Sequence, residues 1–435
     1  MKEIKIGLLG FGTVGAGVVE MLTANAGLLE EHLGATLKLV RIADLDIVSD
    51  RGVAVDRELL TTDAEAVVSD PQVDIVVELI GGYEPARTLV LKALKAGKAV
   101  VTANKALLAL HGRELFAATA AGSGELFFEA SVAGGIPLVT SIRENLGGNR
   151  VLSLLGILNG TCNYILTRMT DCGESFDAAL RDAQEKGFAE ADPSFDVDGI
   201  DTAHKLAVLM GLCWGRLPDF DQIYVEGISR VSAVDIEFAQ RFGYVIKLLA
   251  VSKQTEKGVE ARVHPTMLPV DHPLASVNGV FNAVELVGDF VGPVTWMGPG
   301  AGRRPTASAV VGDILQAARS LLRGGRFRGA PLGYVEGTMA SLPVRSMDEL
   351  KGRFYLRFNV IDCPGVLGRI LTALGEKGIS IASMIQMQRR ADCKVPVVMM
   401  THETREAAIR SALAYIDKDD FVWEPSVFIR IENNL

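Results

Sequence analysis

The residues with the clearest chemical potential lie in the stretch 183–205, which reads AQEKGFAEADPSFDVDGIDTAHK. Gly187 ends one helix pattern there, and a second predicted helix carries Asp201 and Lys205 four positions apart. This spacing places a carboxylate and an ammonium on the same helix face, one turn from each other. Because the polar loop is short and the helix continues as apolar LAVLMGL, we expect these charges to project into a cleft, where they could bind a ligand or exchange protons with it.

Ordinary structural roles explain the same residues. Asp198 and Asp201 could cap the second helix. Asp201 and Lys205 could form a helix pair worth roughly 0.2–0.5 kcal/mol. Glu190 could be a solubilising loop residue, and His204 is predicted on the helix surface rather than as a base. These residues alone leave both interpretations open.

A glycine-rich turn follows the first predicted strand, residues 4–9, and precedes a helix pattern at 18–33. Gly10 permits a tight turn, Gly12 lets a pyrophosphate approach the backbone, and Gly15 lets the helix pack closely on the strand. The helix N-terminus supplies amide donors to the phosphates. The alternative is a purely structural glycine turn, but the order strand, GxGxxG, helix favours a dinucleotide site.

Two further polar residues stand at predicted strand ends. Asp44 follows a strand at 37–43, where an acidic residue would bond the ribose of NAD, although it lies 29 residues beyond Gly15, farther than the usual ~20. A solvent-facing aspartate is the alternative. Lys105 follows the strand 98–102, at the sheet edge where open α/β sheets bind ligands. A lysine in a first helical turn opposes the helix dipole, which favours a functional role over an incidental one.

Strand patterns alternate with helix patterns through the first third of the chain, which is typical of a parallel, doubly wound α/β sheet. The alternation then breaks, and the β-type runs between residues 224 and 291 indicate an α+β domain. The glycines of 298–302 precede a helix at 306–322 and suit either a ligand or a flexible surface loop. The predicted strands of the first third are 4–9, 37–43, 74–80, 98–102 and 124–132, with a helix at 85–96.

The last part of the chain has a pattern of its own. A glycine-rich, basic segment at 324–334 and irregular sequence to about residue 350 indicate a linker. Beyond it the order is β-α-β-β-α-β, a ferredoxin-like arrangement. Its predicted elements are a strand at 354–361, a helix at 364–377, strands at 379–387 and 395–401, a helix at 404–416 and a strand at 427–431.

Composition excludes several classes of protein. The chain has 435 residues, which suggests two to four domains. A net charge of −9 argues against nucleic acid or an anionic membrane as partner. No apolar run is long enough for a membrane span, and no signal-peptide pattern is present. Five scattered cysteines without a CxxC pair fit a reducing, cytoplasmic location and disfavour a zinc site.

With these motifs in view, the sequence resembles the homoserine dehydrogenase family over almost its whole length. The stretch 183–205 fits the family signature throughout, and that long pattern is highly specific. GFGTVG, VVELIGG, TANK, EASVAGGIP, NGTCNYIL and GPGAG also look like family motifs in the family's order. The resemblance implies reversible, NAD(P)-dependent reduction of L-aspartate 4-semialdehyde to L-homoserine, on the route to threonine, methionine and isoleucine.

The resemblance also implies roles for individual residues. Lys205 would donate and accept the proton at the reacting oxygen, Asp201 and Glu190 would bind the amino end of the substrate, and Lys105 would contact both cofactor and substrate. A cationic lysine at the carbonyl provides electrostatic and acid catalysis together. The expected cofactor contacts are Gly10, Gly12, Thr13, Val14, Gly15, Asp44, Lys105, Gly187 and Gly302. A structural sodium ion is expected at Glu129, Val132, Gly134 and Ile136.

One departure from the family concerns the choice between NAD and NADP. Many relatives carry an arginine just before the aspartate that ends the second strand, whereas this chain has Ala43 before Asp44. Arg41 and Arg51 are nearby. We therefore expect NAD to be used at least as well as NADP.

The segment NVIDCPGVLGRI resembles the opening of an ACT-type regulatory domain, with free helix amides at Gly365, Val366 and Leu367 able to hold the carboxylate of an amino-acid effector. Feedback inhibition, by threonine in the first instance, is the expectation; a structural dimerisation domain is the alternative. We expect a homodimer or homotetramer. The predicted domains are 1–132, completed by about 300–322, then 133–299, a linker at 323–350, and 351–435.

Two other functions remain as competitors. An aspartate-semialdehyde dehydrogenase would need a nucleophilic cysteine, and no cysteine stands in a motif that suggests one. A non-catalytic dinucleotide or amino-acid sensor would keep the glycine loop and the regulatory domain but would have no need of Asp201 and Lys205.

Overall fold

The computed structural model describes residues 2–121, 124–324, 330–335, 343–386 and 394–432. The chain divides into two compact units. Unit 1 comprises residues 1–160, 200–223 and 280–342, and unit 2 comprises residues 161–199, 224–279 and 343–435. Each unit therefore joins segments that are far apart in the sequence, and the domain boundaries predicted above stay predictions.

Unit 1 contains a parallel sheet with the strand order β3-β2-β1-β4-β5-β6. This order, which reverses between β1 and β4, is that of doubly wound dinucleotide-binding sheets, and the predicted fold class is confirmed. The strands β1 to β6 are Lys2–Leu9, Ala35–Ala43, Leu60–Thr61, Ile75–Glu78, Ala99–Thr102 and Glu125–Phe127.

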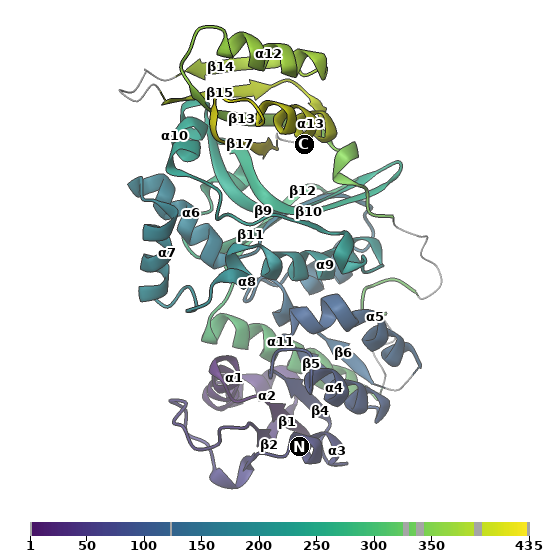
Figure 1. The fold of residues 1–435 in the computed structure, drawn as a ribbon. Helices are drawn as coiled ribbons and strands as arrows, with labels where there is room; N and C mark the ends of the chain where they lie inside the picture. Colours follow the sequence, from purple (N-terminus) through teal and green to yellow (C-terminus); the bar gives the residue numbers. More distant parts are fainter. Residues whose placement is uncertain (1, 122–123, 325–329, 336–342, 387–393, 433–435) are drawn as a thin grey trace. The chain divides into compact units, whose positions relative to one another are not determined.

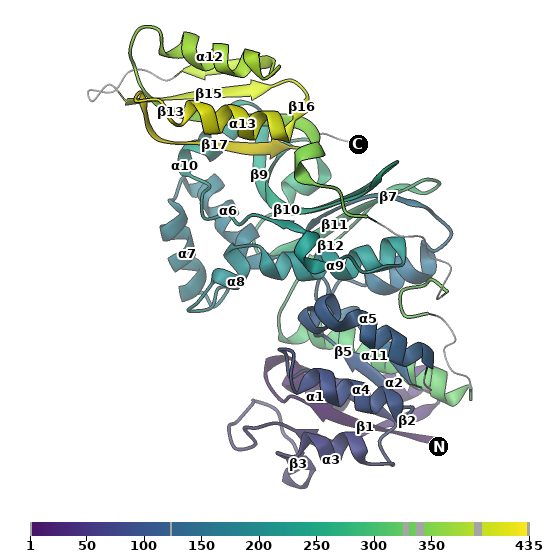
Figure 2. The same cartoon turned by 45° about the vertical axis from the view of Figure 1, so that its right-hand side comes forward.

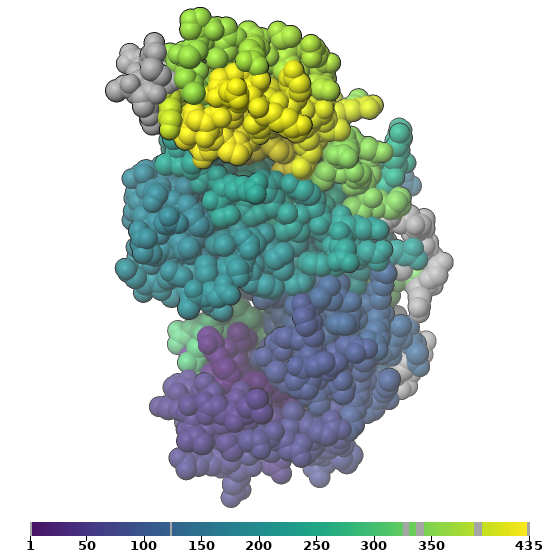
Figure 3. Space-filling model, viewed as in Figure 1, coloured from purple at the N-terminus to yellow at the C-terminus, as the bar shows by residue number. Residues whose placement is uncertain are grey.

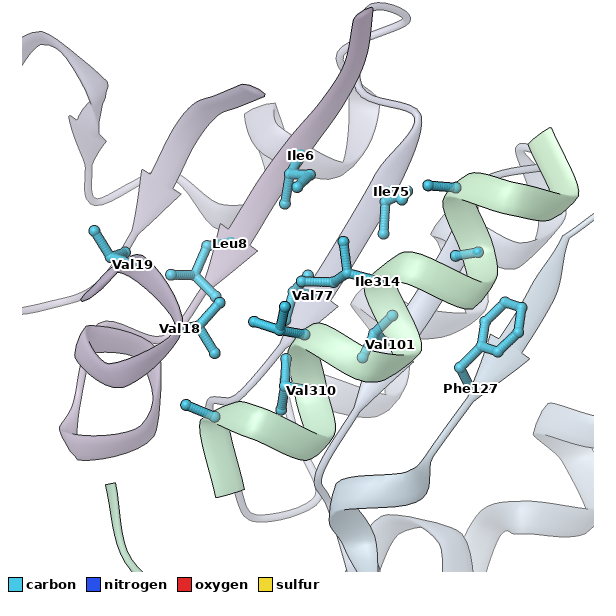
Figure 4. Packing of buried hydrophobic residues seen from close by; sticks show 14 of the residues in the cluster. Ile6, Leu8, Val18, Val19, Ile75, Val77, Val101, Phe127, Val310 and Ile314 are labelled. Atoms are coloured by element: carbon cyan, nitrogen blue, oxygen red, sulfur yellow. The ribbon is translucent and has the colours of Figure 1, made fainter. Parts of the chain in front are cut away.

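Helices cover both faces of this sheet because successive strand residues point to opposite sides. On β1, Ile6 and Leu8 belong to the core formed with α1 and α11, as Figure 4 shows. Gly7 between them faces the other helix layer, where an added Cβ would lie 2.5 Å from a methyl carbon of Val67 in α3. The helices are α1 Thr13–Ala24, α2 Ala26–Leu33, α3 Ala64–Ser69, α4 Ala86–Lys95, α5 Lys105–Ala121 and α11 Arg303–Leu322.

The late helix α11 completes the core of this sheet. Val310 and Ile314 are fully buried and lie over Val77 and Val101 of the central strands (Figure 4). An added Cβ on Gly17 of α1 would lie 2.7 Å from a backbone oxygen of α11, so glycine lets the two helices meet.

Two predicted elements in this region were wrong in detail. The helix expected at 18–33 is broken at Asn25, whose φ of −107° and ψ of 17° are not helical, so α1 and α2 are separate. The strand expected at 124–132 ends at Phe127, and Glu129–Ser131 forms a 3₁₀ turn instead. The reason is that Glu129 turns its carboxylate toward the backbone amides of Val139 and Thr140 rather than extending along a strand.

The rest of unit 1 holds the helix from the stretch 183–205. This helix, α9 Ile200–Trp214, packs on α5. Three antiparallel strands, β7 Val151–Ile157, β11 Phe281–Gly288 and β12 Gly292–Pro299, complete the unit. Part of the predicted linker also packs here, because Leu332 is buried and the hydroxyl of Tyr334 donates to the carbonyl of Cys213; the residues 325–329 and 336–342 of that linker lie outside the described ranges.

Unit 2 contains the predicted ferredoxin-like region, which is confirmed. Its sheet has the order β17-β13-β15-β14, with α12 and α13 packed on one face (Figures 1 and 2). Strand β17 also pairs with β10 of the long hairpin β9–β10. The residues of the C-terminal region form a continuous surface in the space-filling view (Figure 3). The bounds are β9 Tyr244–Thr255, β10 Gly258–Pro269, β13 Lys351–Ile361, α12 Val366–Glu376, β14 Ile381–Gln386, β15 Lys394–Thr401, α13 Glu406–Ile416 and β17 Val422–Ile431.

Unit 2 also holds the helices around the loop of the stretch 183–205. These are α6 Gly160–Cys172, α7 Phe176–Glu185, the short α8 Ser194–Val197 and α10 Ala233–Arg241. In the described part of the chain, no helix is both long and apolar enough to cross a membrane.

Candidate active site

Asp201 lies buried between two lysines at the start of α9. Its Oδ2 accepts hydrogen bonds from Lys205 Nζ at 2.6 Å and from Asn159 Nδ2 at 2.9 Å. Its Oδ1 is 3.3 Å from Lys105 Nζ. The residue is only 4% exposed. The helical spacing therefore brings Lys205 to Asp201 as predicted, and the fold adds Lys105 from the edge of the parallel sheet.

The two lysines differ in their surroundings. Lys205 also donates to the carbonyl of Leu158 at 2.8 Å, and its side chain is 11% exposed, against 36% for Lys105. An ammonium has three donors. Among the hydrogen bonds of the described residues, Lys205 uses two, so one donor remains for a ligand.

The charges of this site decide its protonation. Burial acts to raise the pKa of Asp201, but the charges of Lys205 and Lys105, with hydrogen bonds from Lys205 and Asn159, outweigh burial and hold the pKa below its ordinary value. The carboxylate is therefore ionised at neutral pH. Such an arrangement is not the exposed helix pair considered above.

His204 is not a surface residue, so that prediction was wrong. It is 2% exposed, and its ring stacks on Phe220 at a centroid distance of 4.6 Å. Burial, opposed by Asp201 and assisted by Lys105, lowers the pKa of His204 to about 4. The helix buries nearly all of its faces, which the apolar run after the charged residues indicated only in part.

The glycine turn has the geometry that a dinucleotide requires. Gly10 has a φ of +96°, and an added Cβ would lie 2.6 Å from the carbonyl oxygen of Leu79. At Gly15 it would lie 2.1 Å from the carbonyl oxygen of Gly10, whereas at Gly12 it would meet nothing within 4 Å. Gly12 therefore leaves open space beside the start of α1, where Thr13 and Val14 begin the helix.

Asp44 lies beside this turn and already has protein partners. Its carboxylate accepts the amide of Phe11 at 2.5 Å and lies 4.0 Å from Arg51 Nη2. Arg51 is held by Asp46 at 2.9 Å. Arg41 is exposed and donates to a backbone carbonyl elsewhere. Of the two arginines considered from the sequence, Arg51 is thus the one near Asp44.

The loop predicted to hold sodium is irregular and rich in oxygen. Glu129 accepts the amides of Val139 at 2.7 Å and Thr140 at 2.8 Å. Ala133 and Gly134 both have positive φ, and an added Cβ on Gly134 would lie 2.4 Å from the carbonyl oxygen of Gly300. In the described residues, no hydrogen bond uses the carbonyls of Val132 or Gly134. The carbonyl of Ile136 accepts the amide of Leu138 at 2.8 Å.

The remaining predicted residues lie apart from this group in the chain. Gly302 has a φ of +117° and precedes α11 in unit 1. Glu190 and Gly187 belong to the loop of unit 2, and their contacts with substrate and cofactor stay predictions. Gly365, Val366 and Leu367 begin α12, and Gly365 has a φ of +92°.

Sequence reasoning gave no role to three residues that the fold places here. Asn159 and the carbonyl of Leu158 hold the charged pair of α9, and Glu78 lies buried at the end of β4. The motifs NGTCNYIL and VVELIGG contain Asn159 and Glu78, and Leu158 immediately precedes the first of them; these motifs were the only signal available. Their partners are 42, 47 and 24 residues away, so no local pattern identifies the contacts.

Comparison with known proteins gives a consistent result. The family descriptions that match are the NAD-binding domain of homoserine dehydrogenase at residues 10–129, homoserine dehydrogenase at 137–315 and the ACT domain at 354–418. The chain is 42% identical to the homoserine dehydrogenase of Pseudomonas aeruginosa, covering 99% of both proteins. It is 44% identical to that of Corynebacterium glutamicum, covering 100% of this chain and 96% of that protein.

Solved structures agree. The chain resembles a homoserine dehydrogenase from Thiobacillus denitrificans with a TM-score of 0.93 and 43% identity, covering 100% of this chain and 99% of that one. It resembles a hyperthermophilic archaeal homoserine dehydrogenase in complex with NADPH with a TM-score of 0.63 and 28% identity, covering 75% of this chain and 100% of that one.

Proposed function

Because the chain belongs to the homoserine dehydrogenase family, we propose that Lys205, Asp201 and Lys105 form the centre where this NAD(P)-dependent oxidoreductase binds its substrate and moves the hydroxyl proton. The family interconverts L-homoserine and L-aspartate 4-semialdehyde. The observation that carries the proposal is the buried Asp201 carboxylate held between two lysines.

Each residue has a distinct part in the proposed mechanism. When bound, the nicotinamide supplies the hydride acceptor for homoserine oxidation. Lys205, as the neutral amine, takes the proton from the hydroxyl as the carbonyl forms. The resulting ammonium returns the proton in the reverse direction, where its charge stabilises the developing alkoxide. Asp201 and the carbonyl of Leu158 fix the direction of the Lys205 side chain. Asp201 binds the substrate's amino end, Lys105 contacts substrate and cofactor, and Glu190 is kept as a proposed substrate contact.

Replacing Lys205 by Ala tests this assignment. The expected loss in kcat is about 10²–10⁴-fold, the range of general acid–base catalysis, while cofactor binding stays within about twofold because the glycine turn is untouched. Lys186→Ala is the matched control, since Lys186 is a lysine of the same stretch that is 47% exposed. A Lys205→Ala enzyme with unchanged kcat would contradict the proposal, and so would a variant that loses cofactor affinity in proportion.

We propose that the enzyme uses NAD at least as well as NADP. Support comes from Ala43, which offers no cation before Asp44, and from Arg51, which Asp46 already engages. Gly10, Gly12, Thr13, Val14, Gly15, Asp44, Gly187 and Gly302 are the proposed cofactor contacts. The ratio of kcat/KM for the two cofactors decides the point: a hundredfold preference for NADPH would refute it.

The proposed sodium site consists of Glu129 and the carbonyls of Val132, Gly134 and Ile136. Hard oxygen donors suit an alkali cation, and two of these carbonyls have no hydrogen bond within the described residues. Burial and the neighbouring Glu129 raise the pKa of Asp313, whose carboxyl accepts the amide of Glu129. A bound cation would partly neutralise this acidic pair, and the ion would stabilise the loop rather than take part in the reaction.

The ACT domain is proposed to bind an amino-acid effector, threonine in the first instance, at Gly365–Leu367. The support is the start of an 11-residue helix, whose first amides suit a carboxylate. Activity of the full chain with and without threonine tests this, with Gly365→Ala as a variant that strains the positive φ. If threonine does not inhibit the full-length enzyme, the ACT domain has a structural role instead of a regulatory one.

A homodimer or homotetramer is proposed on the surface of unit 1. The edge strand β12 and the turn before it expose large apolar side chains, among them Phe290 at 91% and Met297 at 62%. Exposed apolar groups of this kind mark association surfaces. Light scattering on the full chain gives the oligomer size.

A further inference from the structure

Glu78 is a buried carboxylate at the carboxyl end of the central strand β4, and the mechanism above does not use it. It is the last residue of β4 and is 0% exposed. In the described part of the chain it forms no ion pair with a lysine or arginine. A buried charge is costly unless hydrogen bonds satisfy it. Among the described residues, Glu78 is buried without an ion pair at the carboxyl ends of the parallel strands, where such sheets bind ligands, so we expect a functional role.

Its hydrogen bonds connect two turns. Oε1 accepts the amides of Ile80 at 2.9 Å and Gly81 at 3.3 Å, in the turn after β4. Oε2 accepts the hydroxyl of Thr102 at 2.6 Å, at the end of β5. Glu78 and Thr102 are direct partners in the parallel pairing of β4 and β5. All these partners are donors, so both carboxyl oxygens of Glu78 act as acceptors.

The second turn leads directly to Lys105. The Thr102 hydroxyl accepts the amide of Asn104 at 3.0 Å, and Asn104 Nδ2 donates to the carbonyl of Gly82 at 2.7 Å. Asn104 Oδ1 accepts the amide of Leu107 in the first turn of α5. The start of this helix, and with it the backbone of Lys105, is therefore fixed by the network that Glu78 anchors.

The first turn leads to the glycine motif. Leu79 and Ile80 lie against Gly10, where an added Cβ would be 2.6 Å from the carbonyl oxygen of Leu79 and 3.0 Å from the amide nitrogen of Ile80. One carboxylate thus anchors both the turn that packs on the glycine motif and the turn that leads to Lys105. Burial raises the pKa of Glu78, and the hydrogen bonds from Thr102 and the turn act against this rise.

We propose that Glu78 is a positioning residue for homoserine oxidation, which acts by holding Lys105 against Asp201. The inference rests on the proposed function of Lys105. Lys105 Nζ lies 3.3 Å from Asp201 Oδ1 with a side chain that is 36% exposed. An exposed lysine side chain is flexible, so its position depends on where its backbone is held.

The experiment measures kcat and KM for homoserine in Glu78→Gln and Thr102→Val, each alone and combined with Lys105→Met. Thr102→Val removes the same link without touching the buried carboxylate, so the test holds even where Glu78→Gln fails to fold. We expect each single variant to lower kcat/KM about tenfold, and the loss to shrink below about twofold in the Lys105→Met background. Glu84→Gln is the control, since Glu84 is 52% exposed in the same connection; it should leave kcat/KM unchanged.

Two results would overturn the inference alone. Equal losses with and without Lys105 would show that Glu78 and Thr102 serve only the fold, and unchanged kcat/KM in both single variants would show no positioning at all. A Lys105→Met enzyme as active as the unmodified one would refute the proposed role of Lys105 and this inference together. The failure of the proposed function is therefore distinguishable from the failure of the inference alone.

Discussion

Each unit buries a group of charged residues, and the two groups differ in kind. The lysine cluster of unit 1 comprises Lys105, Asp201 and Lys205. The arginine cluster of unit 2 is larger, and its members are Lys253, Glu260, Arg262 and Glu432 around β10, with Glu226, Glu406 and Arg430 around β17. Both are built from ion pairs, but the lysine cluster pairs two ammoniums with one carboxylate, whereas the arginine cluster is built around the guanidiniums of Arg262 and Arg430.

The arginine cluster is saturated. Arg262 is 2% exposed and reaches Glu432 at 2.5 Å and Glu260 at 2.9 Å. Arg430 donates to both carboxylate oxygens of Glu406, at 2.6 and 2.7 Å. The planar guanidinium fork matches carboxylates in this way and leaves little capacity for a ligand. A lysine is a compact charge on a flexible stem that can give up a proton, which is what the reaction needs.

The arginine cluster instead attaches the ACT domain. Glu432 and Arg430 come from the C-terminal region, while Arg262, Glu260 and Glu226 come from residues 224–279, and β17 pairs with β10 beside them. A second buried pair, Arg357 and Asp235 at 2.7 Å, joins β13 to α10. Breaking such a pair by removing one partner is strongly destabilising. The comparison therefore separates the cluster proposed to carry out the chemistry from the cluster that attaches the C-terminal domain.

The largest effect on stability is expected from Arg262→Met, which leaves Glu432 and Glu260 without their central cation. The free energy of unfolding should fall by about 3–5 kcal/mol, while kcat stays unchanged where the variant is folded. Urea unfolding measures the first and a homoserine assay the second. Arg241→Met is the control, because Arg241 is 47% exposed and pairs only with Glu237 one turn away. A loss of kcat at full stability would reverse the roles given to the two clusters.

A smaller effect on the free energy of unfolding is expected at acid pH, and it comes from Glu432. Burial acts to raise the pKa of Glu432, but Arg262 and Lys253 outweigh burial and lower the pKa to about 2. A depressed pKa contributes stability above the ordinary value near 4.5, and that contribution is lost as the pH falls toward 2. Glu432→Gln should remove this dependence, up to about 3 kcal/mol.

Unfolding free energies between pH 5 and pH 2 would measure this difference. Glu256→Gln is the control, because Glu256 is exposed in the turn between β9 and β10. This variant should behave as the unmodified protein does. The same acid dependence in Glu432→Gln as in the unmodified protein would exclude the ionised Glu432 as a source of stability.

The smallest effect in free energy is expected from Asp201→Asn, which keeps the shape of the side chain but removes the charge between the lysines. We expect kcat/KM to fall about 10–100-fold, or roughly 1.4–2.7 kcal/mol, because both ammoniums lose their orientation. Asp198→Asn, at an exposed position of the same stretch, should be neutral. Equal losses from both changes would mean that the stretch responds to any loss of negative charge.

The sequence predicted the parts of the fold that local patterns encode. The alternation of apolar runs and the turn at Gly10–Gly15 indicated the parallel sheet, and the spacing of Asp201 and Lys205 indicated a pair on one helix face. The burial of His204 was missed because charged neighbours made its helix look exposed. The break at Asn25 was missed because the apolar pattern continues through it.

Other features depend on residues that only the fold brings together. Asn159 reaches Asp201 across 42 residues, and Arg262 reaches Glu432 across 170. Neither contact has a local signal, because the partners stand in separate elements. Glu78 lay inside the strand predicted at 74–80, and only its parallel pairing with Thr102 shows which turn its carboxyl group contacts.

The central claim is that Lys205 moves the substrate proton, and amine rescue of Lys205→Ala tests it most directly. Turnover of homoserine would be measured with added methylamine and, at equal concentration, with tetramethylammonium, which carries the same charge but no N–H. The account predicts that methylamine restores turnover in proportion to its concentration and that tetramethylammonium does not. Equal rescue by both cations, or no rescue by methylamine, would contradict proton transfer by Lys205.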